Sequence, residues 1–242
     1  MTSFSAFVRA RLPLGAAVGT LLTWCAALVA FRISYSGHIT YRFLLWNLVL
    51  AVVPWVLSGI LRWADDRHRA GWAAAPLLAG WLVFFPNAPY VLTDLLHLAP
   101  KPGVPLWYDL ALLLSCAGTA LALGYLSLLD VHAVLTRRLG WAGGWLAVIG
   151  CLLLTGLGIY LGRYLRWNSW DVVTRPDHIA QELAHRIRYL GRHPRTWGVT
   201  ALFGGFLTLS YVLLRAAQAQ LVAAARHESA HRHPVSVSAP TG

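Results

Sequence analysis

Long apolar stretches separated by short polar ones dominate the chain. Each apolar stretch is about 20 residues long, which is the length of helix that crosses the hydrocarbon core of a bilayer. Arginines or tryptophans stand at most of their ends, as expected for side chains that anchor a helix at the membrane interface. The pattern predicts an all-α polytopic membrane helix bundle with six transmembrane helices, over residues 12–31, 44–61, 73–92, 107–129, 145–162 and 197–214.

The composition agrees with a membrane protein. Of the 242 residues, 57% are hydrophobic and 12% are charged, whereas a soluble domain has roughly a quarter charged residues. The formal net charge of +11 would suggest nucleic-acid binding in a soluble protein. No basic segment is separate from the apolar stretches, however, so we expect the partners to be the lipid bilayer and its anionic head groups, and not nucleic acid.

Small residues inside the apolar stretches predict close packing of helices. Cys25, Cys116 and Cys151 lie in such stretches without the spacing of metal ligands, so we expect them to be small core residues. Gly156 with the two glycines that follow it, at 158 and 162, predicts a seam where one helix approaches another closely.

A different pattern occupies the long connection between the last two predicted spans, residues 163–196. Apolar residues recur there at helical spacing, Thr174 and Asp177 fit a capping box, and Gly191 suits a helix end. We expect one amphipathic helix, lying either on the membrane surface or on the loops of the bundle. Residues 1–226 then form a single transmembrane domain, and residues 227–242, which lack apolar periodicity, form a disordered tail.

A chain that crosses the membrane six times places alternate loops on the same side. The first, third and fifth loops, with the span ends that touch them, hold most of the unusual polar residues. On the opposite face, Asp130 and His132 are expected to be ordinary flanking residues. Arginine and lysine are equally numerous on the two faces, so the direction of insertion stays open.

The stretch FPNAPYVLTDLLHL, residues 85–98, interrupts the third predicted span. Proline removes a backbone donor and breaks the helix, and the asparagine beside it can cap the start of the next one. Backbone that is not helical at this depth is tolerated where it is buried in protein or lines a wet cavity. Asn87, Tyr90, Asp94 and His97 follow at spacings of three, four and three, which places them on one face of a helix.

Other polar residues on the same predicted face extend this candidate site. The candidates for catalysis by proton transfer are Asp94, His97, Asp109 and Asp171. The candidates for substrate binding are Asn47, Asn87, Tyr90, Arg163, Arg166, Trp167, Asn168 and Trp170. Arg163 and Arg166 are expected to pair with the carboxylates or to bind a phosphate or lipid head group. Asp94 and His97, joined by Asp109 or Asp171, are also candidate ligands of a divalent cation. The alternative is an ordinary aromatic belt with charges at the water boundary.

Four motifs together resemble one known family, the bacterial membrane proteins grouped as domain of unknown function 1361. They are WNLVLAVVP (46–54), FPNAPYVLTDLLHL (85–98), WYDLALLLS (107–115) and GIYLGRYLRWNSWDV (158–172). The resemblance covers roughly residues 40–215. It implies a multi-pass protein of the bacterial cytoplasmic membrane, and it implies no particular activity or cofactor.

Three functions fit these expectations. Binding or processing of a lipid or lipid-linked head group agrees with the position of the charged residues near the water boundary. A transporter of small solutes or ions would place ionisable groups near the middle of the membrane, where the sequence offers only Asn47 and Asn87. A structural partner of another membrane complex would use the small-residue seams.

Overall fold

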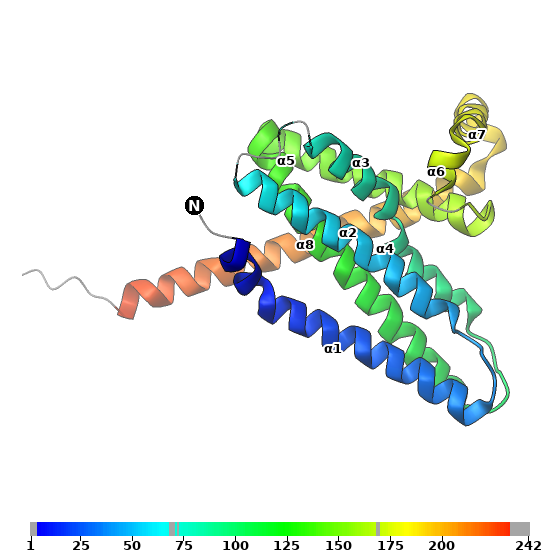
Figure 1. The fold of residues 1–242 in the computed structure, drawn as a ribbon. Helices are drawn as coiled ribbons and strands as arrows, with labels where there is room; N and C mark the ends of the chain where they lie inside the picture. The colour runs from blue at the N-terminus through cyan, green and yellow to red at the C-terminus, as the bar shows by residue number, and fades with distance from the viewer. Residues whose placement is uncertain (1–3, 68–70, 72, 168–169, 233–242) are drawn as a thin grey trace, which may run out of the picture.

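The computed structural model describes residues 4–67, 71, 73–167 and 170–232. Within this part of the chain every regular element is a helix, as Figure 1 shows. In chain order the elements are α1 (Phe4–Ser36), α2 (Phe43–Asp66), α3 (Ala74–Phe84), α4 (Asn87–Tyr90), the 3-10 helix η1 (Val91–His97), α5 (Leu106–Tyr164), α6 (Asp171–Thr174), α7 (Pro176–Arg188), the 3-10 helix η2 (Leu190–Arg192) and α8 (Pro194–Arg232).

Five helical stretches in the described residues are long and apolar enough to cross a membrane. They are α1, α2, α5, α8 and the combined stretch Ala74–His97, which holds α3, α4 and η1. The protein is therefore a multi-pass membrane protein with an all-helical fold, and the predicted fold class is confirmed. The extent of the transmembrane domain, residues 1–226, stays a prediction.

The helix α5 contains a reversal at Gly140. Its 59 residues would extend about 88 Å as one straight helix, far more than a bilayer core of about 30 Å. Gly140 has φ 77° and ψ 174°, a conformation that interrupts the helix and suits glycine. A Cβ atom on Gly144 would lie 2.5 Å from Oγ1 of Thr136, so the chain turns back on itself. We call residues 106–139 the first limb and residues 141–164 the second limb; they correspond to the fourth and fifth predicted spans.

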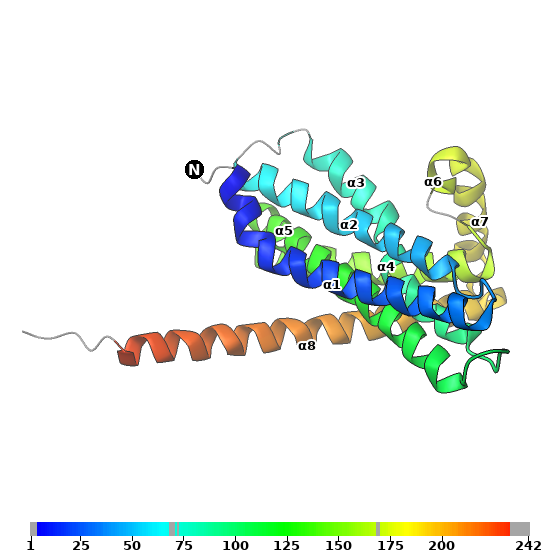
Figure 2. The same cartoon turned by 60° about the horizontal axis from the view of Figure 1, so that its bottom comes forward.

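The turns of the chain gather at two ends of the bundle. The loops 37–42 and 98–105 and the segment with α6, α7 and η2 lie at one end, which we call the loop end (Figures 1 and 2). The start of α1 and the C-terminal end of α8 lie at the opposite end in both views. The first, third and fifth loops therefore share one end, as predicted.

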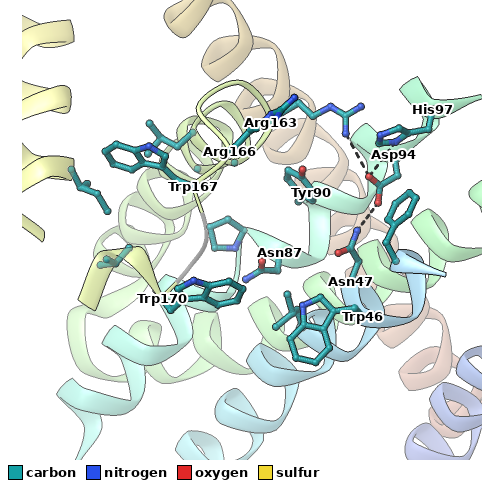
Figure 3. Close-up of a pocket in the computed structure, with 18 residues that line it drawn as sticks. Trp46, Asn47, Asn87, Tyr90, Asp94, His97, Arg163, Arg166, Trp167 and Trp170 are labelled. Carbon is teal, nitrogen blue, oxygen red and sulfur yellow. Dashed lines mark hydrogen bonds and ion pairs between the residues drawn. The ribbon is translucent and has the colours of Figure 1, made fainter. Parts of the chain in front are cut away.

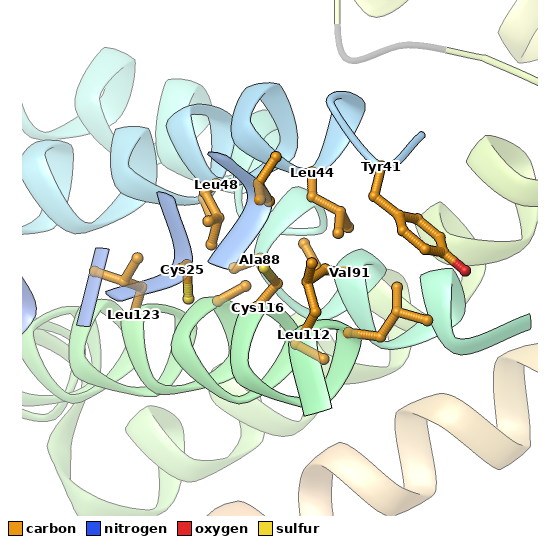
Figure 4. Close-up of a cluster of buried hydrophobic side chains, with 14 of the residues drawn as sticks. Cys25, Tyr41, Leu44, Leu48, Ala88, Val91, Leu112, Cys116 and Leu123 are labelled. Carbon is orange, nitrogen blue, oxygen red and sulfur yellow. The ribbon is translucent and has the colours of Figure 1, made fainter. Parts of the chain in front are cut away.

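Two apolar cores hold the helices together. One core lies between α1, α2, α4 and the first limb of α5, and Cys25 and Cys116 are fully buried in it together with Leu44 (Figure 4). The other core joins α2, α3, α5 and α8 around Trp81 and Tyr211. Cys25 and Cys116 are thus core residues, as predicted, and Cys151 is half-buried beside the second core.

Several local predictions were wrong. The first helix continues to Ser36 instead of ending at 31, because Gly37, at φ 70°, is the first residue with a left-handed backbone, and its amide donates to the carbonyl of Ile33. Asp130 and His132 are not flanking residues. Asp130 is buried and pairs with Arg11, and Nδ1 of buried His132 lies 2.9 Å from the Tyr211 hydroxyl.

The fifth connection also differs in detail from its prediction. The amphipathic helix exists as α7 and begins with Pro176, but its N-cap residue is Arg175, and Thr174 Oγ1 donates instead to the carbonyl of Trp170. The predicted capping box is therefore absent, and Gly191 lies within η2. The helix α8 continues to Arg232, so residues 227–232 are helical where a tail was expected, and residues 233–242 of that tail lie outside the described residues.

Candidate functional site

A cavity of about 440 Å³ opens at the loop end between α2, α4, η1, the second limb of α5, α6 and α7 (Figure 3). Its size lies within the range of small-molecule sites, about 300–1,000 Å³. The lining residues are Phe43, Trp46, Asn47, Leu50, Pro86, Asn87, Tyr90, Asp94, His97, Gly158, Leu161, Gly162, Arg163, Arg166, Trp167, Trp170, Val172 and Ile179. Ten of these were named as candidate site residues or stand in the motif that breaks the third span.

Asp94 is the centre of the polar end of the cavity. Its side chain is only 2% exposed, and its Oδ2 accepts a hydrogen bond of 2.8 Å from Nδ2 of Asn47. Its Oδ1 lies 3.7 Å from a guanidinium nitrogen of Arg163 and 3.7 Å from Nδ1 of His97. These two distances exceed hydrogen-bond length. Asp94 therefore has one firm hydrogen bond, from Asn47, and two more distant neighbours, Arg163 and His97.

The broken third span positions this carboxyl group. The helix α3 ends at Phe84, and Asn87 Nδ2 donates to the Phe84 carbonyl at 2.9 Å. Asn87 thus satisfies the end of the preceding helix and does not cap the next one, contrary to the sequence prediction. After the break, Asn87, Tyr90, Asp94 and His97 all line the cavity, which confirms that these four residues share one face.

Two glycines allow the second limb of α5 to form the opposite wall. A Cβ atom on Gly158 would lie 3.0 Å from Cβ of Pro86, and one on Gly162 would lie 3.1 Å from the ring of Tyr90. Both are closer than ordinary contacts, so the backbone of α5 approaches the broken span in a way that larger residues would prevent. The predicted seam therefore forms here, and Gly156 packs in the same way against Gly204 of α8.

The end of α5 places two arginines in the cavity. Arg166 has φ 59°, a left-handed conformation that is unusual for a residue other than glycine and that ends the helix. The next amide, of Trp167, donates back to the Leu161 carbonyl at 3.2 Å. Arg163 and Arg166 both line the cavity. Among the described residues Arg166 has no carboxylate partner, whereas Arg163 has the distant contact with Asp94.

Asp109 does not belong to this cavity. Its two carboxylate oxygens accept hydrogen bonds of 2.8 and 3.1 Å from Nε and Nη2 of Arg32, and both side chains are fully buried between α1 and the first limb of α5. Arg163 and Arg166, its predicted partners, do not reach it. Asp109 is therefore a partner of α1, and its predicted catalytic role has no support from its position.

Tyr41 connects this buried pair with the cavity. Its ring lies 5.1 Å from the Arg32 guanidinium, and its hydroxyl donates to the His97 carbonyl at 3.1 Å. Burial raises the pKa of Tyr41, and the nearby Asp109 carboxylate adds to the effect, so the phenol keeps its proton and remains a donor. Tyr41 thereby fixes the end of η1, which carries His97.

The remaining predicted residues occupy different positions. Trp167 and Trp170 line the cavity, as Figure 3 shows. Asp171 begins α6 between the lining residues Trp170 and Val172 but does not line the cavity itself. Asn168 lies outside the described residues. The described residues contain no group of three His, Cys, Asp or Glu side chains arranged to hold a metal ion, so Asp94 and His97 do not gain a third ligand of these types there.

The sequence-predicted site residues do not include Arg32, Tyr41, Phe43 and Trp46. The predicted end of the first span at residue 31 places Arg32 at the start of a loop, whereas the helix ends at Ser36, before Gly37. Trp46 stands in the motif WNLVLAVVP beside the predicted residue Asn47. A tryptophan one residue from an amide in an apolar helix is a usable signal for a site wall, because the two side chains leave the helix about 100° apart.

The electrostatics of the cavity favour an anion. Its lining holds two guanidinium groups and one carboxyl group, and that carboxyl already accepts a hydrogen bond from Asn47. Arginine donates in a fork that matches the oxygens of phosphate or carboxylate groups. Trp46, Trp167 and Trp170 line the remainder, so the cavity offers cationic and aromatic surface to one ligand.

Comparison with known proteins gives a single match. The model of the family described as protein of unknown function (DUF1361) matches residues 46–210. This range includes every cavity-lining residue except Phe43, and it leaves out α1 with Arg32. No curated protein and no solved structure matches the chain.

Proposed function

The chain belongs to this DUF1361 family of proteins of unknown function, and we propose that it binds the anionic, phosphate-type head group of a lipid or lipid-linked molecule in the loop-end cavity. The membrane implied by the family resemblance is the bacterial cytoplasmic membrane. The observation that carries the proposal is the pairing of Arg163 and Arg166 in one cavity with a single, already hydrogen-bonded carboxyl group. Arginines in such a setting retain donors for a ligand.

The depth of the polar groups supports a head group over a transported solute. Asn47 lies four residues past the start of α2 at Phe43, which is about 6 Å along the helix axis. His97 is the last residue of η1, and Arg163 is the last residue but one of α5. The charged groups therefore lie within about one turn of the helix ends, at the level of lipid head groups, whereas transporters bind their substrates near the midplane.

Processing of the bound head group is a second candidate function, and one observation favours it. Nδ1 of His97 is buried without a hydrogen-bond partner in the described part of the chain, and it lies 3.7 Å from Oδ1 of Asp94. A histidine beside a carboxyl group can transfer a proton to or from a bound ligand. Asp94 and His97 would then be the catalytic pair, and binding would remain the first step.

Removing the two arginines tests the proposal. We expect Arg163→Ala with Arg166→Ala to weaken binding of glycerol phosphate and of dioleoylphosphatidic acid by about 100-fold, roughly tenfold for each lost charge-assisted contact. Affinities would be measured by native mass spectrometry of the full chain purified in a neutral detergent. Each probe is titrated against the wild type and the variants.

A matched variant separates the cavity from general attraction to a basic surface. Arg188 and Arg192 also lie at the loop end, where each guanidinium stacks on Tyr189, and neither lines the cavity. Arg188→Ala with Arg192→Ala removes the same charge and is expected to change either affinity by less than about threefold. Equal losses in the two double variants would overturn the cavity as the binding site.

A further inference from the structure

We propose that the ligand is a two-part lipid that enters the cavity sideways from the bilayer, and that its hydrocarbon chain leaves past Phe43 and Trp46 and lies along α2. This inference rests on the proposed head-group binding and adds the route and the class of the ligand. It follows from the exposed residues at the opening of the cavity, which we call the mouth: Phe43, Trp46, Arg166, Trp170 and Val172.

Trp46 belongs to two surfaces at once. It lines the cavity, and 56% of its surface is exposed. The other large apolar residues exposed on α2 are Phe43, Val49, Val56 and Ile60. With position 46 they lie at spacings of three, three, seven and four, which places them on one side of the helix. In a membrane-spanning bundle an exposed apolar stripe faces lipid. The wall of the cavity at Trp46 is therefore also part of the lipid-facing surface.

The opposite rim of the mouth carries two apolar residues and one arginine. Trp170 and Val172 both line the cavity and are 45% and 43% exposed. Arg166, which also lines the cavity, is exposed and is the charged residue of this rim. The charged residues Asp94 and Arg163 lie at the other end of the cavity from Trp167 and Trp170 (Figure 3). The mouth thus suits a ligand that is polar at one end and apolar at the other.

A shallow groove continues from the mouth along α2. It is lined by Ile39, Arg42, Phe43, Leu45, Trp46 and Val49, so it shares Phe43 and Trp46 with the cavity. From Arg42 to Val49 the helix advances about 10 Å, from the loop end toward the middle of the membrane. The groove therefore begins beside a cation and becomes apolar with depth, which is the polarity of a lipid at an interface.

A lipid is the occupant that these features favour. Continuity with the cavity lets one molecule place its head group at Arg163 and its chain on the groove. Arg42 at the shallow end complements a phosphate-bearing lipid in charge. Four of the six groove residues belong to α2, and Ile39 and Arg42 lie in the turn before it. The amides of Arg42 and Leu45 donate to the carbonyls of Ile39 and Arg42, so the groove offers no extended edge for a peptide strand.

The test compares two exposed valines of α2. Val49 and Val56 are 54% and 48% exposed; Val49 lines the groove and Val56 does not, and neither lines the cavity. We expect Val49→Trp, which fills the groove, to weaken binding of dioleoylphosphatidic acid about tenfold and to leave binding of glycerol phosphate, which has no chain, unchanged. Val56→Trp should change neither affinity. Native mass spectrometry of the full chain in neutral detergent measures both affinities for the wild type and for each variant.

The outcomes separate the two proposals. If Val49→Trp leaves phosphatidic acid binding unchanged while Arg163→Ala with Arg166→Ala abolishes it, the lateral chain is overturned and the head-group site stands. If Val49→Trp weakens both probes equally, the substitution acts on the head-group site and the groove claim is overturned. If neither probe binds the wild type, both proposals fall. If Val49→Trp instead dissociates a dimer seen in the spectra, a second copy of the chain covers the α2 face, and the lipid groove is again overturned.

Discussion

Two aspartate–arginine pairs at the loop end differ in how completely the partners satisfy each other. Arg32 and Asp109 form two hydrogen bonds, of 2.8 and 3.1 Å, and both side chains are fully buried. Arg163 and Asp94 are 3.7 Å apart, and the arginine is 17% exposed in a cavity wall. The first pair is closed to any ligand, and the second is open to one.

An intramembrane charge does not by itself mark a functional site. Both aspartates satisfied the rule that ionisable residues in membrane helices are functional candidates when a partner exists. In the closed pair, the partner uses the carboxylate completely, so the pair serves to join α1 to α5. In the open pair, donors of the arginine remain unused beside a cavity. The number of unused donors separates the two cases better than burial does.

Breaking the closed pair should have the largest effect on stability. Asp109→Leu leaves the Arg32 guanidinium buried without its carboxylate partner, and we expect a loss of about 3–5 kcal/mol in the free energy of unfolding. Asp94→Leu leaves Arg163 in a cavity wall, where its side chain is 17% exposed, and the expected loss is about 1–2 kcal/mol, from the hydrogen bond with Asn47. Thermal unfolding of the purified variants in detergent measures both.

A double variant tests the cause. Arg32→Met with Asp109→Leu replaces both partners by apolar residues of similar size, and such replacements of buried ion pairs are often neutral. We expect most of the stability to return. If the double variant is as unstable as Asp109→Leu, the loss arises from altered packing and not from the unpaired charge.

A larger residue where α5 contacts the broken third span should affect the cavity. Gly158→Ala places a methyl group 3.0 Å from the rigid ring of Pro86, and we expect a loss of about 1–3 kcal/mol with weaker phosphatidic acid binding. Gly150→Ala, in the same limb, meets nothing within 4 Å and should stabilise the helix by up to about 1 kcal/mol. If Gly158→Ala changed neither the free energy of unfolding nor phosphatidic acid binding, the close contact with Pro86 would be contradicted.

The sequence predicted the course of the chain and one face of the site, and it missed the pairing between helices. Hydrophobic runs of bilayer length specify helices directly, and the Pro–Asn break specified the stripe from Asn87 to His97. Which arginine meets which carboxylate depends on where each helix ends. The predicted end of the first span lies five residues before the end of α1 at Ser36. That difference places Arg32 in a loop and leaves Arg163 and Arg166 as the predicted partners of Asp109.

Tyr41 offers a finer test because it contacts both Arg32 of the closed pair and His97 of the cavity. Tyr41→Phe removes the hydrogen bond to the His97 carbonyl, and we expect a loss of about 1 kcal/mol in unfolding free energy. Because the pKa of Tyr41 is raised above its ordinary value, the hydroxyl stays protonated and the loss should be constant between pH 6 and about pH 9. Tyr35, which is 67% exposed, is the control: Tyr35→Phe should be neutral. A loss in Tyr41→Phe that disappears at pH 9 would contradict the donor role.

The smallest expected change comes from neutralising the open carboxyl group itself. Asp94→Asn retains an oxygen that can accept the hydrogen bond from Asn47, but it no longer attracts Arg163. An anionic ligand then meets less repulsion, so we expect glycerol phosphate to bind a few-fold more tightly, with a stability change below about 1 kcal/mol. Asp109→Asn, in contrast, should destabilise the protein without improving binding. Weaker binding in Asp94→Asn would mean that Asp94 contacts the ligand directly, as it would if the head group carried an amine.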